Sequence, residues 1–446
     1  MKKLDSVVEA AARPLLLGAT AVADMVTRRR VAGATFNLFN TILGGGGGIV
    51  PLPRCVRLVG LKVAPGLLVS SAILSAYSAC AVVAASVAVR ESTYQGVAHR
   101  TIGRRGATLV QVLIVSLTFG ISVAVIDIFA DVAPSMLQLS RTTTVLLAGS
   151  IVTPIVALVR RIDKLACISA CASALVAAFV IFVFVHFSSG HRSSEQALHS
   201  SPSMADVREA MSIVNLSFLC HFNLLPLFRG LPGAPAVAAR RSMYGVIVIA
   251  TLLSLLVYAS VGILGFIAFG EATSGNAFAD YAAAGGRAAL WLNYAITTAQ
   301  LLSLPLLVHE GVRELVGLIG VRRVAPTAAE QHTLLRSAGR DGSDDEHVAL
   351  GEAHRGAKAS NERLCAVVWC ACATCIAVFA ADTSKVLAVI AALCGAPLMS
   401  VLPIVMLLRS NHGMGGRALV LNCALLMLGI GISTACAVDA VRGLLR

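Results

Sequence analysis

Five consecutive glycines mark the first place where this sequence could do chemistry, and they stand within an apolar stretch. They are Gly44, Gly45, Gly46, Gly47 and Gly48. Each glycine costs about 1 kcal/mol relative to alanine inside a helix, so the run predicts an unwound segment. Backbone left unpaired at membrane depth is tolerated where it lines a cavity or contacts a ligand. We therefore expect a ligand site here, with close helix packing as the alternative.

A second interruption is expected further along the chain. Pro226 removes the backbone bond to residue 222 and clashes with its carbonyl, which predicts a broken helix. The candidate binding residues beside this break are Phe218, Cys220, His221 and Asn223. For His221 two interpretations stay open, a hydrogen-bonded packing residue and a proton carrier. The polar residues before the glycine run, Asn37, Asn40 and Thr41, complete the candidate site.

Two carboxylates, Asp127 and Asp131, lie one turn apart near the end of an apolar segment. A bare carboxylate costs about 2.5–3.5 kcal/mol at the centre of a membrane helix, so each needs a compensating partner. One alternative for Asp127 is outside water or a basic residue such as Arg141. The other is a cavity in which Asp127 complements a cationic ligand.

The elements that must position these residues are membrane-spanning helices. Of the 446 residues, 57% are hydrophobic and 13% are charged, and the mean hydropathy is +0.82. A spanning helix requires roughly 20 mostly apolar residues. Eleven segments meet this requirement: 33–53, 63–89, 107–131, 143–159, 165–187, 210–228, 242–269, 288–309, 363–381, 384–408 and 417–440. The sequence therefore predicts an all-α membrane protein that contacts the lipid bilayer.

The basic residues predict the orientation of these helices. With the amino terminus inside, 26 of the 36 Lys and Arg residues fall on the cytoplasmic side. We expect a cytoplasmic tail at 1–31, an eleven-helix domain at 32–446, an extracellular loop at 188–209 and a disordered cytoplasmic loop at 321–362. The net charge of +13 is spread between apolar runs and faces lipid headgroups, so no nucleic-acid partner is expected. The plasma membrane is the expected location, with an internal membrane as the alternative.

Enzymatic chemistry is not expected. The sequence contains no metal-ligand cluster, nucleophile motif or phosphate loop at membrane depth, so no metal, cofactor or catalytic residue is assigned.

The two interrupted helices, the first and the sixth, occupy matched positions in two five-helix halves. Discontinuous helices at matched positions indicate a 5+5 inverted repeat of the LeuT-like kind, with broken helices one and six.

Six stretches resemble the amino acid/auxin permease family, in the same order along the chain. In the first, an asparagine precedes a glycine-containing element, two aliphatic residues and a proline, matched by Asn37, the glycine run, Ile49-Val50 and Pro53. The stretches are 37–53, 128–134, 153–165, 220–229, 266–270 and 384–403. The resemblance implies transport of an amino acid by alternating access, coupled to H⁺ or Na⁺. An amino-acid-sensing membrane receptor on the same fold is the alternative.

The resemblance also implies roles for particular residues. Exposed N–H groups at the glycine run would bind the substrate carboxylate, and freed carbonyls with the polar residues before it would accept from the ammonium group. Sodium would bind near Thr297, Thr298 and Ser303, whereas proton coupling would use Asp131 or His221. The sequence departs from the family where a tyrosine often precedes residue 128, so the choice of amino acid is open. If Asp127 faces a cationic substrate, Asp127→Asn weakens uptake of arginine and lysine most.

Overall fold

The structure is a computed structural model, and it describes residues 28–43, 48–158, 166–190, 202–232, 237–319, 344–380, 383–410 and 415–444. Within these ranges every regular element is a helix and no strand occurs. Ten of the described helices are long and apolar enough to cross a membrane. The prediction of a multi-pass, all-α membrane protein is therefore confirmed, because helices satisfy their own backbone hydrogen bonds inside lipid.

The helices follow one another along the chain with short connections. After a helix at residues 28–43 come α2 (Leu52–Val89), α3 (Tyr94–Ile102), α4 (Arg104–Leu137), α5 (Arg141–Leu158), α6 (Ala166–Ser188), α7 (Met204–Ser217), α8 (His221–Arg229) and α9 (Val237–Phe269). The remaining elements are α10 (Ala277–Ala284), α11 (Gly286–Ile319), α13 (Asp344–Phe379), α14 (Thr383–Ile390), α15 (Leu402–Ser410) and α16 (Gly416–Leu444). Two π-helical turns, Ala391–Gly395 and Pro397–Val401, join α14 to α15.

The first predicted span, 33–53, differs from the structure. Residues 28–43 form a helix, residues 48–51 form a turn, and α2 begins at Leu52. Gly60 then interrupts α2, because its φ of 75° and ψ of 162° lie in a region that side chains other than glycine's rarely adopt. Gly60 thus divides α2 into two limbs, residues 52–59 and 61–89. The separate helix predicted to start at residue 63 corresponds to the second limb. Helix 28–43 is too short to span a membrane by itself.

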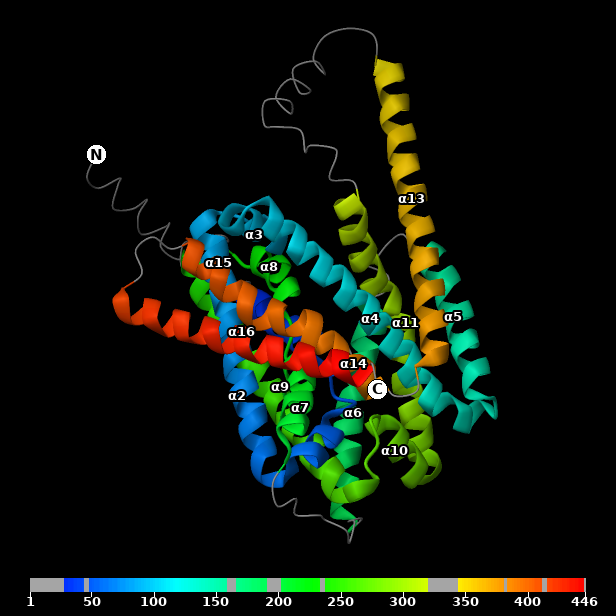
Figure 1. Ribbon diagram of the computed structural model, residues 1–446. Helices are drawn as coiled ribbons and strands as arrows, with labels where there is room; N and C mark the ends of the chain where they lie inside the picture. The colour runs from blue at the N-terminus through cyan, green and yellow to red at the C-terminus, as the bar shows by residue number, and fades with distance from the viewer. Residues whose placement is uncertain are drawn as a thin grey trace, which may run out of the picture.

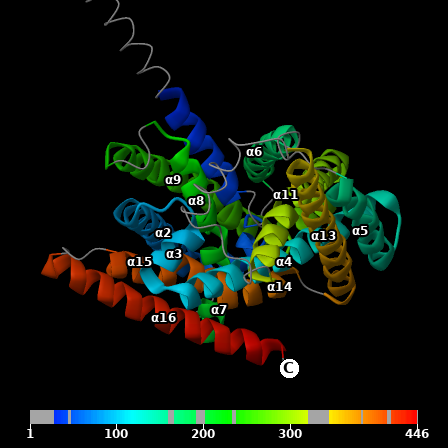
Figure 2. The same ribbon diagram turned by 90° about the horizontal axis from the view of Figure 1, so that it is seen from above.

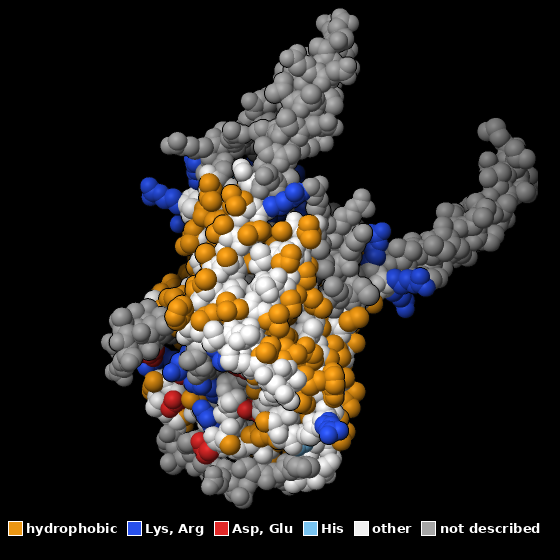
Figure 3. Space-filling view, turned by 90° about the vertical axis from the view of Figure 1, so that its right-hand side faces the viewer, with side chains coloured by type: hydrophobic (Ala, Val, Ile, Leu, Met, Phe, Trp, Pro, Cys, Tyr) orange, Lys and Arg blue, Asp and Glu red, His pale blue; other side chains and the backbone are white. Residues whose placement is uncertain are grey.

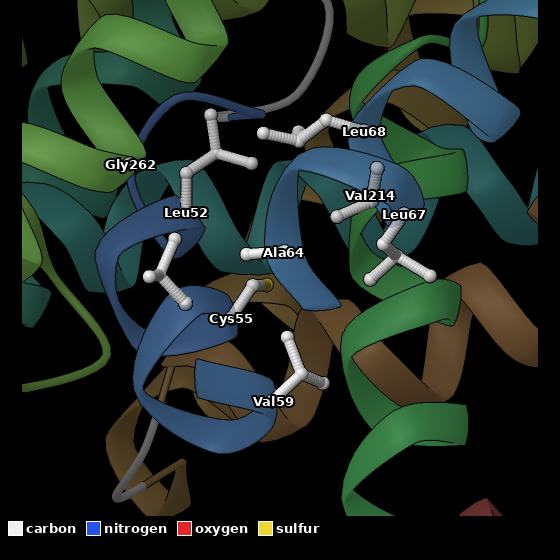
Figure 4. Close-up of a pocket in the computed structure, with 9 residues that line it drawn as sticks. Leu52, Cys55, Val59, Ala64, Leu67, Leu68, Val214 and Gly262 are labelled. Atoms are coloured by element: carbon white, nitrogen blue, oxygen red, sulfur yellow. The ribbon is translucent and has the colours of Figure 1, made fainter. Parts of the chain in front are cut away.

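The two limbs of α2 pack around a small apolar void, shown in Figure 4. Leu52 and Cys55 come from the first limb and Leu67 from the second, and Val214 of α7 closes the void. Its volume is about 10 Å³, which is at the lower limit for one water molecule. Since its lining is apolar, the void is a packing contact and holds no substrate.

The interruption of the sixth predicted helix lies upstream of the expected position. Helix α7 ends at Ser217, α8 begins at His221, and Pro226 lies inside α8. The prediction that Pro226 breaks the helix is therefore wrong, because the break lies at residues 218–220. Pro226 stays helical because it removes a single bond, to the carbonyl of Phe222 in the first turn of α8.

Two predicted loops are shorter than expected at their carboxyl ends. The outer loop 188–209 ends where α7 begins at Met204, because Ser203 and Asp206 form a reciprocal capping box there. The inner loop 321–362 is helical from Asp344, where α13 begins. The sequence Asp344-Asp345-Glu346 favours a helix amino terminus, since acidic groups complement the positive end of the helix dipole.

The helices form one bundle in which α2 packs against α7 and α9, and α4 packs against α11 (Figure 1). Helices α5 and α13 lie together on one side of this core, and α16 crosses the opposite side (Figure 2). Two ion pairs hold α7 against α2 and α16. Glu209 of α7 pairs with Arg54 of α2 at 3.0 Å, and Arg208 of α7 pairs with Asp439 of α16. A broad hydrophobic belt covers the face shown in Figure 3, with charged side chains gathered above and below it. This distribution fits a protein surrounded by lipid.

Candidate functional site

The residue 28–43 helix, the following turn and α7 meet at Gly48 and Ser217. The Ser217 hydroxyl donates a hydrogen bond of 2.8 Å to the Gly48 carbonyl. A Cβ atom at position 48 would lie 2.8 Å from the Ser217 Cα, which is closer than real Cβ contacts. Glycine is therefore required at position 48 because two backbones touch there. The other four glycines of the run, Gly44 to Gly47, lie outside the described residues.

Tyr258 of α9 joins the ends of the two interrupted helices. Its hydroxyl lies 2.7 Å from the Ile42 carbonyl and 2.8 Å from the Ser217 carbonyl. Its ring contacts the Phe218 ring edge-on, with centroids 5.0 Å apart. On the other side, the Ser75 hydroxyl of α2 donates to the Phe218 carbonyl at 2.8 Å. The Ser75 proton satisfies the Phe218 carbonyl, and the single Tyr258 proton is shared between the Ile42 and Ser217 carbonyls, so each of these carbonyls keeps at least one lone pair.

Two helix amino termini adjoin the same place, which we call the joint (Gly48, Ser217, Phe218 and His221). Helix α2 starts after Pro51 and α8 starts after Cys220, and neither has a side-chain cap. An uncapped amino terminus has a positive dipole end that favours an anion. In α2 the first turn offers few N–H groups, because Pro53 has none and the Leu52 N–H donates to the Ile49 carbonyl at 3.3 Å, so the anion-binding N–H groups must come from α8. Carbonyl-bearing helix ends and positive helix ends therefore meet at the joint, an arrangement that suits a ligand with one charge of each sign.

His221 is fully buried at the start of α8. Its Nε2 atom lies 2.8 Å from the Ser78 hydroxyl oxygen, and that hydroxyl lies 2.7 Å from the Leu74 carbonyl. We assign the Ser78 proton to the Leu74 carbonyl, which can only accept, and Nε2 as the donor to Ser78. Nδ1 is then an acceptor, and it has no hydrogen-bond partner within the part of the chain that the structure describes.

The other residues predicted at this site are distributed unevenly. Cys220 is buried in the break itself, and Asn223 is half-buried one turn into α8. On the residue 28–43 helix, Asn37 is exposed, and its carbonyl accepts from the Thr41 hydroxyl at 2.9 Å. Asn40 is half-buried, and its Oδ1 atom is enclosed without a partner among the residues described here. The geometry thus places Asn40 nearer the interior than Asn37.

The predicted sodium residues all lie on α11. The hydroxyls of Thr297 and Ser303 donate to carbonyls of their own helix, at 3.0 Å to Asn293 and at 2.8 Å to Ala299. The Thr298 hydroxyl is enclosed and has no partner in the described ranges. Hydroxyls bonded in this way keep lone pairs that could face a cation, so the sodium assignment stays a prediction.

The two carboxylates of α4 form an ion-pair cluster. Asp127 pairs with Arg141 of α5 and accepts from the Thr383 hydroxyl at 2.7 Å. Asp131 pairs with Arg141 at 3.3 Å and accepts from the Asn276 amide at 3.1 Å. The pairing with Arg141, one of the two alternatives for Asp127, is therefore the one that the structure contains. The cluster ties α4 to α5, α14 and the residue before α10.

Replacing Arg141 with methionine is expected to lower the free energy of unfolding by about 3–5 kcal/mol, because it leaves the Asp127 carboxylate buried without its cation. Thermal unfolding of purified protein in detergent measures the loss. The double variant Arg141→Met with Asp127→Asn should recover much of it, since no buried charge then remains. An unchanged melting temperature in Arg141→Met would contradict the role of the pair.

Ser217, Tyr258 and Ser78 were missed by the sequence analysis. Ser217 directly precedes the predicted Phe218, so its proximity to the break was the available signal. Tyr258 and Ser78 lie inside mostly apolar segments that contain several other hydroxyl residues, and nothing in the local pattern distinguishes them from those residues. Their partners are 41 and 143 residues away in the chain.

An all-helical bundle in which ten of the described helices are long and apolar enough to cross a membrane defines the class of multi-pass helical membrane proteins. In fold the chain is similar to a solved manganese transporter from Eremococcus coleocola, with a TM-score of 0.50 and 12% identity, covering 93% of this chain and 96% of that chain. The chain belongs to the amino acid/auxin permease family, described as transmembrane amino acid transporter protein, whose family model matches residues 28–438. The predicted family is confirmed.

Several relatives are similar at low identity. Amino acid transporter AVT6E of Arabidopsis thaliana is 26% identical over 64% of this chain and 62% of its own length. Vacuolar amino acid transporter 5 of Schizosaccharomyces pombe is 26% identical over 62% of this chain and 66% of its own length. Putative sodium-coupled neutral amino acid transporter 11 of Bos taurus is 24% identical over 56% of both chains. The chain thus matches less than two thirds of the length of each of these relatives.

Proposed function

We propose that this protein carries amino acids across a membrane by alternating access, with the substrate bound at the joint. The observation that carries the proposal is the contact of Gly48 with Ser217, bridged by Tyr258, which joins two helix ends inside the bundle. The residue 28–43 helix and the first limb of α2 together form one interrupted span, and α7 with α8 forms the second. They correspond to helices one and six of an eleven-helix inverted repeat.

A zwitterion fits the charges at the joint. The amino termini of α2 and α8 offer positive dipole ends for the carboxylate, and the first turn of α8 offers N–H groups. The carbonyls of Ile42, Gly48 and Ser217 each keep a lone pair for the ammonium group. Rocking of the helices that carry these ends against α4 and α11 would expose the joint to each side in turn.

A neutral amino acid is the favoured substrate. Complementing a cationic side chain would require a free carboxylate, and the Asp127 carboxylate already pairs with Arg141. We therefore expect Asp127→Asn to lower uptake of lysine and alanine by the same factor, through loss of the cluster. The vacuolar relative makes an internal membrane as suitable a location as the plasma membrane for this chain.

Uptake into proteoliposomes tests the proposal. Radiolabelled amino acids are supplied one at a time under imposed proton and sodium gradients. Saturable uptake that unlabelled neutral amino acids compete away supports transport. Tight binding of an amino acid without flux under any gradient would instead support a sensing receptor on the same fold. Absence of both would remove amino acids as ligands.

A further inference from the structure

We propose that the coupling ion is a proton and that it binds to Nδ1 of His221, together with the substrate carboxylate. This inference rests on the proposed transport function and specifies how that function is driven. It starts from a feature of the joint that binding of substrate to backbone does not use, a buried imidazole nitrogen that has no hydrogen-bond partner among the described residues.

The hydrogen bonds around His221 determine which nitrogen is available. The Ser78 proton is directed to the Leu74 carbonyl, so Nε2 carries the hydrogen of the neutral ring. Nδ1 holds the free lone pair and is the atom that a proton would add to. Histidine is the side chain whose ordinary titration falls nearest neutral pH.

The other candidate carriers are already committed to partners. Asp131 contacts Arg141, Asn276 and Thr383. Asp127 contacts Arg141 and Thr383. Both carboxylates thus have a guanidinium and a neutral donor as partners, whereas Nδ1 of His221 has no hydrogen-bond partner among the described residues. Between the two carriers that the sequence suggested, Asp131 and His221, the geometry points to His221.

The surroundings of His221 contain no countercharge for an imidazolium in the described part of the chain. Helix α8 packs against α2 and α9, whose titratable groups near the joint are Cys80 and Tyr258, together with Cys220 in the break. All are neutral in their ordinary forms. The charged side chains of these three helices are all basic: Arg54, Arg57 and Lys62 in the first part of α2, Arg229 at the end of α8, and Arg240 and Arg241 of α9.

Proton and substrate therefore support each other's binding. A proton on Nδ1 places a positive charge in a dry interior at the positive end of α8, which is costly without an anion. The substrate carboxylate at the same helix end supplies that anion. Each ligand raises the affinity for the other, as reciprocal linkage requires. The proton enters from water on one side, stays on Nδ1 while the carboxylate is bound, and returns to water on the other side.

The experiment compares His221→Gln with wild type in proteoliposomes. Glutamine can keep a donor toward Ser78 but cannot take up a proton. In wild type, an inward proton gradient without sodium should drive accumulation, and a trapped pH dye should record acidification only when substrate is present. In His221→Gln, both signals should be lost, whereas exchange of labelled for unlabelled substrate should persist but require a higher substrate concentration, because the proton no longer supports substrate binding. His99→Gln, on the exposed face of α3, is the control and should behave as wild type.

Exchange activity also shows that the variant is folded. Should His221→Gln fail to fold, Ser78→Ala provides the second test. It removes the acceptor of the Nε2 hydrogen, so the pH of half-maximal uptake should become more acidic by about one unit. Accumulation driven by sodium alone, proton-driven accumulation that persists in His221→Gln, or an unshifted pH profile in Ser78→Ala would overturn the proton assignment. Those outcomes would not contradict the proposed transport function. Absence of any uptake or exchange in wild type would overturn that function.

Discussion

Replacing Gly48 with alanine is expected to reduce the initial rate of amino acid uptake roughly tenfold or more. The new Cβ would lie 2.8 Å from the Ser217 Cα and 3.0 Å from its Cβ, so a backbone must move for it to fit. Moving the turn also breaks the hydrogen bond from Ser217 to the Gly48 carbonyl. The substrate site and the contact between the two interrupted helices are lost together. Uptake into proteoliposomes, normalised to the amount of inserted protein, measures the effect.

Gly66→Ala is the matched control for this variant. Gly66 lies in the second limb of α2, and a Cβ there meets nothing within 4 Å. Since alanine also favours a helix over glycine, the control should keep full uptake and a slightly higher melting temperature. If Gly48→Ala transports with wild-type rate and affinity, the joint is not the substrate site.

Replacing Tyr258 with phenylalanine is expected to raise the substrate concentration for half-maximal uptake by roughly tenfold, with a loss of about 1–3 kcal/mol in stability. The variant keeps the ring that contacts Phe218. It loses the hydroxyl that lies between the Ile42 and Ser217 carbonyls. Both helix ends then keep a buried carbonyl without that donor, and their relative position is no longer fixed. Concentration-dependent uptake and thermal unfolding measure the two effects.

Tyr77→Phe separates the site effect from a general loss of a hydrogen bond. The Tyr77 hydroxyl donates to Asn422 of α16 at 2.9 Å, away from the joint. Its removal should lower the melting temperature without changing the half-maximal substrate concentration. The interpretation of Tyr258 as a bridge at the substrate site fails if both variants change affinity equally, or if neither does.

Composition and local pattern determined the class of this protein. Long apolar segments can satisfy their backbone in lipid only as helices, so hydropathy alone predicted a multi-pass helical protein. The family was readable because its short motifs occur in order along the chain. The glycine run identified the neighbourhood of Gly48 because consecutive glycines weaken a helix whatever surrounds them.

Helix ends were less predictable. Pro226 was expected to break its helix and does not, whereas the break at Phe218 to Cys220 has no glycine or proline. A break without such a residue is stabilised by distant groups. Here the Ser75 and Tyr258 hydroxyls satisfy the carbonyls that the break exposes. Local propensity gives no indication of those partners.

The tertiary structure decided which polar residues act together. Asp127 lies within an apolar helix, and the sequence left it with two roles, since only folding brings Arg141 and Thr383 to it. His221 likewise acquires a defined tautomer from Ser78, a residue 143 positions away. The sequence by itself determined the membrane-spanning helices and the family, because both depend on residues close together in the chain. The joint and its hydrogen bonds depend on contacts between distant segments, which only packing of the helices creates.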